Sequence, residues 1–364
     1  MALGKDYNLG PAIFPRGWFM IAPSEEATNM PLPVRYFSRD MVLYRGESGK
    51  PYLVDAYCPH MGAHIGDNTT SFVVQDKAQI DGESIRCPFH NWRFGPDGQC
   101  THIPYFKGPI PAAARIETFP VVERAGVIWM WHDEEGGAPA YDLPTFAEWD
   151  DPEWVRWTMD IVGELNIHPI EVVDNMADVG HMVPVHGSVN CVYFDNDFDG
   201  ITVSQKLTAG HRVLAEGDSS ITYSTWYTGP ALLQSRLEGD LPAHMLIAHT
   251  PIEDGKLKMW HALMVKCANP AAEDKGVGMA RAYQAASLST LAQDVQSWSR
   301  KKPIFNPLVV PADGPVGRVR RWYKQFYEPA AAAPDTWARI NGKIVSLDVP
   351  EGEEGFGAMP AKAS

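Results

Sequence analysis

Apolar and polar residues alternate with a period of two through much of the first third of the chain, in short runs separated by glycine-containing turns. This pattern is typical of β-strands. Met41–Arg45 and Tyr52–Asp55 flank the turn Gly46–Gly49, and the apolar run Gly126–Trp131 indicates a buried strand that closes the unit. We therefore expect a small all-β domain over residues 14–133.

The second part of the chain mixes two periods. Pro169–His181 and Met279–Trp298 have the spacing of amphipathic helices, whereas Ile221–Tyr227 and Leu257–Val265 alternate as strands, the latter after a hairpin turn at Asp254–Gly255. The second helix has an apolar stripe that we expect to be its buried face, formed by Leu288, Leu291, Val295 and Trp298. These elements predict an antiparallel sheet with helices packed on it.

Changes in composition mark the boundaries between these parts. The segment 136–140 is rich in glycine, alanine and proline, and a second stretch rich in alanine and proline follows residue 328. We therefore expect a linker over 134–150, a second domain over 151–328 and a C-terminal tail over 329–364. The whole chain is predicted to belong to the α+β class.

The overall charge narrows the possible partners. The 364 residues include 31 Lys and Arg against 45 Asp and Glu, a formal net charge of −14. This balance argues against nucleic acid as a partner, because phosphate binding requires a basic surface. No apolar run approaches the ~18 residues of a membrane span, and the N-terminus does not have a signal-peptide pattern. We therefore expect a cytoplasmic protein that does not span a membrane.

Five cysteines, an odd number in a chain of this length, argue against a disulfide framework. Two of them share a turn with a histidine, as Cys58-Pro-His60 and, after a gap of 26 residues, as Cys87-Pro-Phe-His90. One cysteine and one histidine from each of two loops form the ligand set of a Rieske [2Fe–2S] centre, which Trp92 would shield from water. The alternatives are a zinc knuckle, which usually takes its cysteines from one loop, and unconnected core residues.

A second group of possible metal ligands lies in the first predicted helix. Its polar positions fall on one face at helical spacing and comprise Glu171, Asp174, Asn175, Asp178 and His181. A buried polar stripe needs a partner, and a metal ion is a suitable one. His186 follows five residues after His181 with Pro184 between them, so the helix must end or bend there to bring both imidazoles to one point.

Two histidines and one carboxylate are the protein ligands of non-haem Fe(II) oxygenases, which leave coordination positions open for dioxygen and substrate. Asp294 is the candidate carboxylate, because it lies beside the apolar stripe of its helix, next to Leu291 and Trp298. By itself, the histidine pair fits two core histidines equally well. The upstream cluster motif favours a metal, because a cluster that relays single electrons needs an acceptor.

Three polar residues before the first histidine are candidates for supporting roles. Asp178 lies one helical turn before His181 and is placed to hold its ring orientation, although a surface carboxylate is the alternative. Asp174 and Asn175 either support the iron ligands or end the polar stripe.

With these residues in place, the chain resembles the Rieske non-haem iron oxygenases over almost its whole length. Within that family it is most similar to the oxygenase components of 3-ketosteroid 9α-hydroxylases. The resemblance is carried by 15–18 (PRGW), 58–62 (CPHMG), 87–93 (CPFHNWR), 173–181 (VDNMADVGH), 293–298 (QDVQSW), 306–310 (NPLVV) and 320–327 (RRWYKQFY).

The resemblance implies a fold and two metal sites. It implies an N-terminal Rieske domain followed by a catalytic domain of the helix-grip, START-like kind. The expected ligands of the cluster are Cys58, His60, Cys87 and His90. Those of the catalytic mononuclear iron are His181, His186 and Asp294.

The same resemblance implies the assembly and the reaction. Asp178 is expected to bridge the mononuclear site to a Rieske histidine of the neighbouring subunit, so that the working unit is a homotrimer. A separate NADH-dependent reductase with flavin and an iron–sulfur centre is expected to supply electrons for a monooxygenase reaction that uses O2 as cosubstrate. The implied role is hydroxylation of a steroid, in steroid metabolism and lipid degradation.

The substrate pocket is expected between residues 195 and 265. This stretch is rich in large apolar side chains, which fit a bulky apolar substrate or equally a packed core, namely Tyr223, Trp226, Tyr227, Leu232, Leu233, Met245, Leu246 and Trp260. Two classes of alternative stay open. The same machinery could perform sterol desaturation, oxidative demethylation or oxygenation of an aromatic acid. A Rieske electron carrier or a zinc-stabilised binding module is the non-enzymatic alternative, although a carrier does not need the 232 residues that follow His132.

Overall fold

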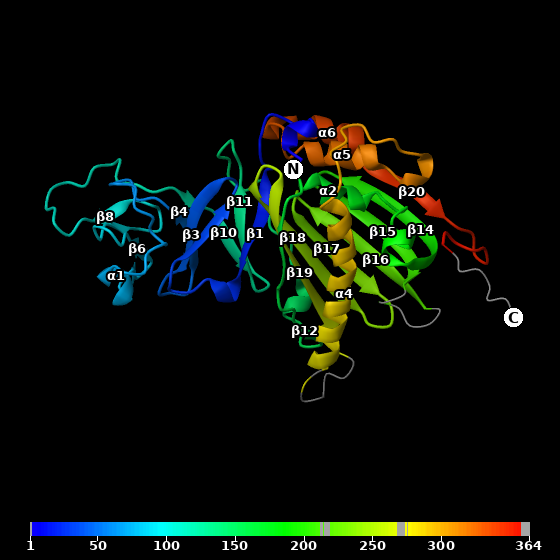
Figure 1. Cartoon of the computed structure of the whole chain (residues 1–364), viewed down its shortest axis with the longest axis horizontal. Coiled ribbons are helices and arrows are strands. Elements are labelled where there is room, and N and C mark those ends of the chain that lie inside the picture. The colour runs from blue at the N-terminus through cyan, green and yellow to red at the C-terminus, as the bar shows by residue number, and fades with distance from the viewer. Residues whose placement is uncertain (1, 212–213, 215–218, 268–273, 275, 358–364) are drawn as a thin grey trace. The chain divides into compact units, whose positions relative to one another are not determined.

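The computed structural model of the chain describes residues 2–211, 214, 219–267, 274 and 276–357 (Figure 1). The chain divides into two compact units, Trp18–His132 and a second unit that unites Met1–Gly17 with Asp133–Ser364. The segment 134–150, expected as a linker, falls in the second unit. It contains the 3-10 helix η3 (Ala147–Trp149), whose Glu148 carboxylate pairs with His244 and Arg236.

The first unit is an all-β assembly of small antiparallel sheets, as the alternating pattern predicted. Their strand orders are β1-β11-β10, β2-β3-β4-β9 and β5-β6-β7-β8. The strands are β1 (Gly17–Pro23), β2 (Leu32–Tyr36), β3 (Arg39–Arg45), β4 (Pro51–Asp55), β5 (Ile80–Asp81), β6 (Ser84–Arg86), β7 (Arg93–Phe94), β8 (Cys100–His102), β9 (Thr118–Phe119), β10 (Val121–Arg124) and β11 (Val127–His132). Short helical turns are η2 (Ser24–Glu26) and α1 (Phe72–Gln75). The predicted hairpin over 41–55 and the predicted closing strand are both confirmed.

The second unit is built on one antiparallel sheet of nine strands. Their order is β12-β19-β18-β17-β16-β15-β14-β20, with β13 also paired to β19. The strands are β12 (Trp154–Val155), β13 (Asp160–Leu165), β14 (Ser188–Asp199), β15 (Thr202–His211), β16 (Ser220–Thr228), β17 (Leu232–Glu238), β18 (Ala243–Glu253), β19 (Lys256–Lys266) and β20 (Gly342–Asp348). The hairpin predicted at residues 254 and 255 joins β18 to β19. The expected α+β class is confirmed.

Helix α4 (Val277–Trp298) lies across one face of this sheet (Figure 1). It contains the predicted helix, but its buried face is rotated from the predicted apolar stripe. Leu288 and Val295 are only half-buried. The buried positions include three polar side chains, Gln284, Ser287 and Asp294. Buried polar groups need partners, and in this helix the sheet and α3 provide them.

The helix predicted over 169–181 is broken. It forms only α2 (Ile170–Val173) and η4 (Asp174–Met176), and a separate turn, α3 (Met182–His186), follows. Side chains compete for the backbone groups that a continuous helix would use. The Asn196 amide donates to the carbonyl of Met176 at 2.5 Å, and the carboxylate of Asp178 accepts from the backbone N–H of His181 at 3.1 Å.

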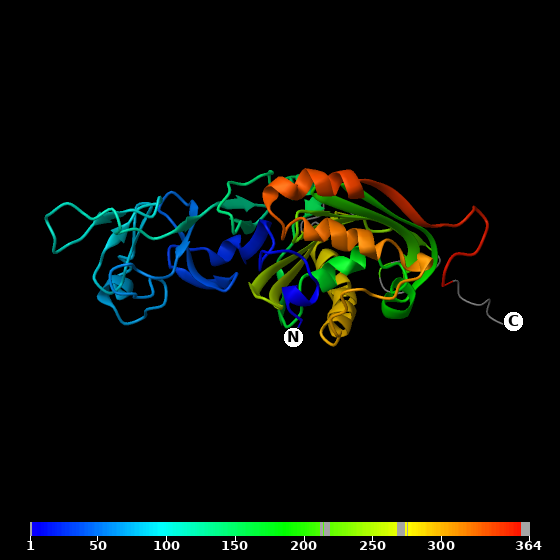
Figure 2. The ribbon, with the colours of Figure 1, turned by 90° about the horizontal axis from the view of Figure 1, so that it is seen from above.

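The segment expected as a C-terminal tail contributes to the fold. Residues 330–348 form η6 (Ala330–Ala332), α6 (Ala333–Ile340) and strand β20, which pairs with β14. Helices α5 (Val316–Lys324) and α6 lie beside each other (Figure 2). They cover the β14–β15 turn, where Trp322 and Gln325 donate to the carbonyl of Gly200. Two further 3-10 turns are η1 (Gly4–Asp6) and η5 (Pro311–Asp313). Within the described ranges, no helix is both long and apolar enough to cross a bilayer.

Candidate metal centres

The two loops that hold the cysteine–histidine pairs have matching backbones. In each loop the N–H of the cysteine donates to the carbonyl five residues later, Ala63 for Cys58 and Trp92 for Cys87. In each loop, the backbone N–H of the residue four positions after the cysteine donates to the carbonyl of that cysteine. These residues, Gly62 at φ 74° and Asn91 at φ 58°, have the left-handed backbone conformation. Glycine and asparagine are the residues that adopt this conformation most readily, which explains why they follow the two cysteines.

The side chains of these loops converge. The rings of His60 and His90 lie 4.5 Å apart, and Trp92 stacks on His60 at 4.4 Å with an interplanar angle of 12°. Both cysteines are buried in the apolar core of the first unit, and a hydrogen bond from Cys58 lowers the pKa of the Cys87 thiol. The Nδ1 atom of His60 is buried without a hydrogen-bond partner among the described residues. Two adjoining sulfurs, two adjoining imidazoles and one buried nitrogen without a partner fit an iron–sulfur cluster held between the loops.

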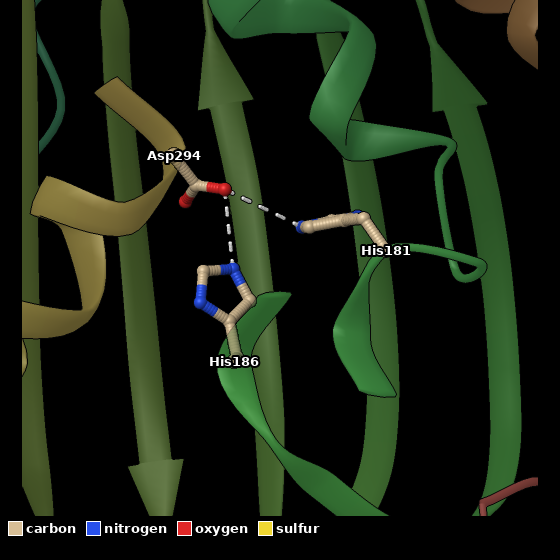
Figure 3. A group of neighbouring side chains, drawn as sticks. All are labelled: His181, His186 and Asp294. Carbon is tan, nitrogen blue, oxygen red and sulfur yellow. Dashed lines mark ion pairs between the residues drawn. The ribbon is translucent and has the colours of Figure 1, made fainter. Parts of the chain in front are cut away.

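The second group brings together three residues from different elements (Figure 3). His181 precedes α3 and His186 ends it, because Gly187 at φ 66° stops the helix directly afterwards. Asp294 projects from α4 between them. Its Oδ1 atom lies 3.8 Å from His181 Nε2 and 3.2 Å from His186 Nε2, and one ligand atom from each residue lies within 4.8 Å of the others. Residues far apart in sequence therefore present two imidazole nitrogens and one carboxylate to one point.

The other ring nitrogen of each histidine has an acceptor. His181 Nδ1 lies 2.6 Å from the carbonyl of Asp178, and His186 Nδ1 lies 3.1 Å from Oε1 of Gln293. Since a carbonyl oxygen only accepts, each Nδ1 carries the proton and each Nε2 offers its lone pair toward Asp294. Burial opposes protonation of His181, but Asp178 and Asp294 outweigh it and raise its pKa. The site therefore attracts positive charge, and its donor set fits a divalent iron.

Of the three residues with expected supporting roles, Asn175 and Asp178 lie beside His181, and Asp174 pairs elsewhere. The amide nitrogen of Asn175 lies 3.5 Å from His181 Nε2, while its Oδ1 atom accepts from Trp298 Nε1 at 3.2 Å. Asp178 reaches His181 with its carbonyl and, at 3.5 Å from Nδ1, with its carboxylate, while 42% of its side chain stays exposed. Asp174 instead pairs with Arg320 at 2.6 Å. The bond from His186 to Gln293 was not expected, although Gln293 adjoins Asp294 in the sequence.

A cavity of about 880 Å³, measured with its open mouth, begins at these three residues. Its wall is mainly apolar and uses the sheet as one side. Of the eight apolar residues proposed for a pocket, Tyr223, Leu233 and Met245 line it. Tyr227, Leu232, Leu246 and Trp260 are fully buried core residues instead, and the half-buried Trp226 is not part of the cavity wall.

A Rieske-like β unit and a helix-grip unit whose His–His–carboxylate group opens into a cavity define the class of Rieske non-haem iron oxygenases. Residues 17–120 match the Rieske [2Fe-2S] domain family, and residues 130–327 match the 3-ketosteroid 9alpha-hydroxylase C-terminal domain. The chain therefore belongs to the family of the oxygenase components of 3-ketosteroid 9α-monooxygenases.

The chain is similar to individual relatives in sequence and to solved structures in fold. The chain is 32% identical to a probable 3-ketosteroid-9-alpha-monooxygenase, oxygenase component, of Rhodococcus rhodochrous, over 88% of this chain and 82% of the relative. It is 29% identical to cholesterol 7-desaturase of Caenorhabditis elegans, over 87% of this chain and 78% of the relative. Its fold is similar to that of Pseudomonas putida CBB5 NdmA with caffeine, with TM-score 0.69 and 16% identity over 92% of this chain and 97% of that one. It is also similar to dicamba monooxygenase bound to dicamba, with TM-score 0.65 and 19% identity over 86% and 97% of the two chains.

Proposed function

We propose that this oxygenase component hydroxylates a steroid-like substrate, with 3-ketosteroids as the first candidates, using O2 and electrons from a separate NADH-dependent reductase with flavin and an iron–sulfur centre. The observation that carries the proposal is the group of His181, His186 and Asp294 in the wall of a mainly apolar cavity. The names of the relatives support the substrate class. We further propose that the enzyme works in the cytoplasm, in the degradation of steroid lipids.

Two sets of residues would hold the metals. Cys58, His60, Cys87 and His90 would hold the [2Fe–2S] cluster, and His181, His186 and Asp294 the mononuclear iron. When bound, the cluster would supply single electrons and the iron would activate dioxygen. We also infer that residues 14–133 and 151–328 are the functional domains that carry these two centres.

The chain's own residues prepare the mononuclear site for that chemistry. The carbonyl of Asp178 and the amide oxygen of Gln293 keep a proton on Nδ1 of each histidine, so that Nε2 stays available as a ligand. Trp298 fixes the amide of Asn175 beside the site by donating to its Oδ1 atom. Apolar side chains such as Leu233 and Leu291 line the cavity and exclude water from the carbon that is oxidised.

Asp178 is the proposed connection to a second subunit. Its exposed carboxylate lies in a surface groove that also contains Ile304, Pro307 and Val309. The groove is lined mainly by charged side chains, including Lys301 and Lys302, and the adjoining segment 304–310 exposes apolar side chains, with Leu308 99% accessible. We infer that a Rieske loop of a neighbouring copy covers this surface, with a histidine against Asp178, and that three copies close the ring.

The first unit has a matching surface around its cysteine–histidine loops. Large apolar side chains are exposed there, namely Met61, Phe72, Phe89, Tyr105 and Phe106. Several large apolar side chains exposed in one region favour an interface with another protein surface. Mass measurement in solution should give a trimer for the native chain, and Leu308→Glu should give a smaller species. A monomeric native chain would contradict the proposed assembly.

A single-turnover assay tests the reaction. The purified, chemically reduced protein is exposed to oxygen with 3-ketosteroids, sterols and smaller aromatic acids, and the products are identified by mass. We expect a steroid that gains one oxygen atom, and no such product from Asp294→Ala. Loss of two hydrogens would indicate desaturation, which the similarity to a cholesterol desaturase makes the second candidate.

A second variant tests Asp178 separately. Asp178→Asn keeps the backbone carbonyl that orients His181 but removes the negative charge at the proposed subunit contact. We expect normal iron content, a normal Rieske spectrum and very little product. Hydroxylation at the native rate by this variant would rule out the proposed role of Asp178.

A further inference from the structure

A chain of hydrogen bonds leads from the wall of the cavity into the sheet. Ser287, on α4, lines the cavity, is 4% exposed and lies with its Oγ atom 2.9 Å from Nε2 of His261 on β19. The Nδ1 atom of His261 lies 2.9 Å from Oδ2 of Asp160 on β13. The metal ligands use none of these three residues.

Asp160, the last residue in this chain of hydrogen bonds, determines which atom donates in each hydrogen bond. Asp160 Oδ2 also accepts from the side-chain amide of Gln284 at 2.8 Å. Burial raises the pKa of Asp160, but the hydrogen bonds from His261 and Gln284 outweigh it and lower the pKa, so this carboxylate is ionised and only accepts. His261 therefore carries a proton on Nδ1. In the neutral imidazole Nε2 is then the acceptor, and the hydroxyl of Ser287 donates to it.

Among the described residues, the structure gives one alternative acceptor for the Ser287 hydroxyl, and it is weaker than His261. The sulfur of Met245 lies 3.6 Å from Ser287 Oγ, but a thioether is a weaker acceptor than an imidazole nitrogen. Neighbouring hydroxyls on α4 bond back to their own helix, since Ser289 and Thr290 both donate to the carbonyl of Ala286. Ser287, which lines the cavity, instead gives its proton to His261 in the sheet, so its oxygen can only accept from a further partner.

The serine, histidine and aspartate have the order of a hydrolytic triad, but the helix argues against a nucleophile. Ser287 lies in the middle of a helix of 22 residues, where backbone N–H groups are used by helical hydrogen bonds. A serine hydrolase needs free N–H donors beside its nucleophile to stabilise the oxyanion. Recognition of a substrate group is the role that fits this position.

We propose that Ser287 accepts a hydrogen bond from a hydroxyl group of the substrate, held in the accepting orientation by His261 and Asp160. Ser287 and Asp294 lie seven residues apart on the same face of α4, which separates them by about 10 Å along the helix axis. The substrate class is therefore a bulky apolar molecule with an alcohol remote from the carbon that is oxidised. A ketone in the same position has no proton to donate and brings its oxygen against the lone pairs of Ser287. This inference rests on the proposed steroid substrate and refines it.

Matched pairs of steroids test this preference by calorimetric binding to the intact protein. One pair is androst-4-ene-3,17-dione and its 17β-alcohol, and the other is 5α-androstane-3,17-dione and its 3β-alcohol. We expect the alcohol to bind about five- to tenfold more tightly than the ketone in one of the two pairs. Ser287→Ala should reduce this ratio to within about twofold. Ser289→Ala, which removes a hydroxyl from the same helix outside the cavity, should keep it.

The outcomes separate this inference from the proposed function. Equal or tighter binding of the ketone in both pairs by the native protein would overturn the role of Ser287 even if Ser287→Ala failed to fold, while leaving the steroid substrate in place. An unchanged preference in folded Ser287→Ala would do the same. Failure of all four steroids to bind would overturn both the inference and the proposed substrate class.

Discussion

Arg320 connects three segments around the proposed subunit contact, and its removal is expected to destabilise the second unit strongly. From α5 its guanidinium reaches both carboxylate oxygens of Asp174, at 3.0 and 2.6 Å, and the backbone carbonyls of Ile304 and Phe305, at 2.6 and 3.1 Å. Only 8% of Asp174 is exposed. In Arg320→Met the aliphatic part of the side chain remains, but a buried carboxylate loses its main partner.

The magnitude follows from that loss. Removing one partner of a buried ion pair lowers the free energy of unfolding by about 3–5 kcal/mol. We expect the lower end, because Lys301 still acts on the charge of Asp174. A loss of about 3 kcal/mol is a large part of the ~5–15 kcal/mol that stabilises a folded domain. Urea unfolding followed by tryptophan fluorescence measures it, and Arg321→Met, which removes an exposed arginine from the same helix, should stay within about 0.5 kcal/mol of the native protein.

The pH dependence provides a stricter test. Burial raises the pKa of Asp174 even though Arg320 lowers it, so the folded protein binds this proton more tightly than the unfolded chain. A raised acid pKa destabilises the fold as pH rises above the ordinary value of that carboxyl group. Arg320→Met raises the pKa further, so its stability loss should be full at pH 8 and shrink as the pH falls and Asp174 takes up a proton. Asp174→Asn added to Arg320→Met should recover stability at pH 8. A loss that grows on acidification, or one equal to that of Arg321→Met, would refute the reasoning.

Three further predictions concern other parts of the molecule. Gln293→Leu, which removes the acceptor for His186, should weaken Co(II) binding at the mononuclear site about tenfold, while Gln296→Leu on the exposed face of α4 should not. Equal affinities would contradict the role of Gln293. Asn91→Val should cost about 1–2 kcal/mol from the left-handed backbone alone and reduce the Rieske absorbance, and Asn91→Gly should keep it. Burial lowers the pKa of His168 from 6.5 to about 3. Stability should therefore fall as the pH drops below 6.5, by up to about 1.4 kcal/mol per pH unit for this group, and urea unfolding of His168→Phe should show a smaller acid slope.

Local pattern was sufficient where structure depends on near neighbours. The alternation over 41–55 predicted β3, its turn and β4, and the helical spacing over 279–298 gave α4 to within two residues of its start. The cysteine–histidine motifs predicted a pair of loops for the same reason. Each motif holds its ligands within four residues, and Gly62 and Asn91, within two residues after the histidine, complete the turn.

Pattern failed where a distant side chain decides the local structure. The helical spacing over 169–181 is real, but Asn196, twenty residues later, takes the carbonyl of Met176 and helps to end the helix. Periodicity also placed the centre of the buried face of α4 too close to Leu288. The partners that allow Ser287 to be buried instead, His261 and Asp160, come from two other strands that the helix sequence does not contain.

Helix α4 contributes both Asp294 and Ser287 to the cavity wall, and this has a consequence for substrate choice. Asp294 at the proposed metal and Ser287 at the proposed alcohol site lie on one rigid helix, so their separation is set by helical geometry and not by a loop. Substitutions in the cavity wall at β17 or β18 can alter the width of an accepted substrate without changing the distance between Asp294 and Ser287. A change in the position that is oxidised requires either a different hydrogen-bonding residue on α4 or loss of the Ser287 contact. The length between alcohol and oxidised carbon is therefore the property of the substrate that this fold fixes most firmly.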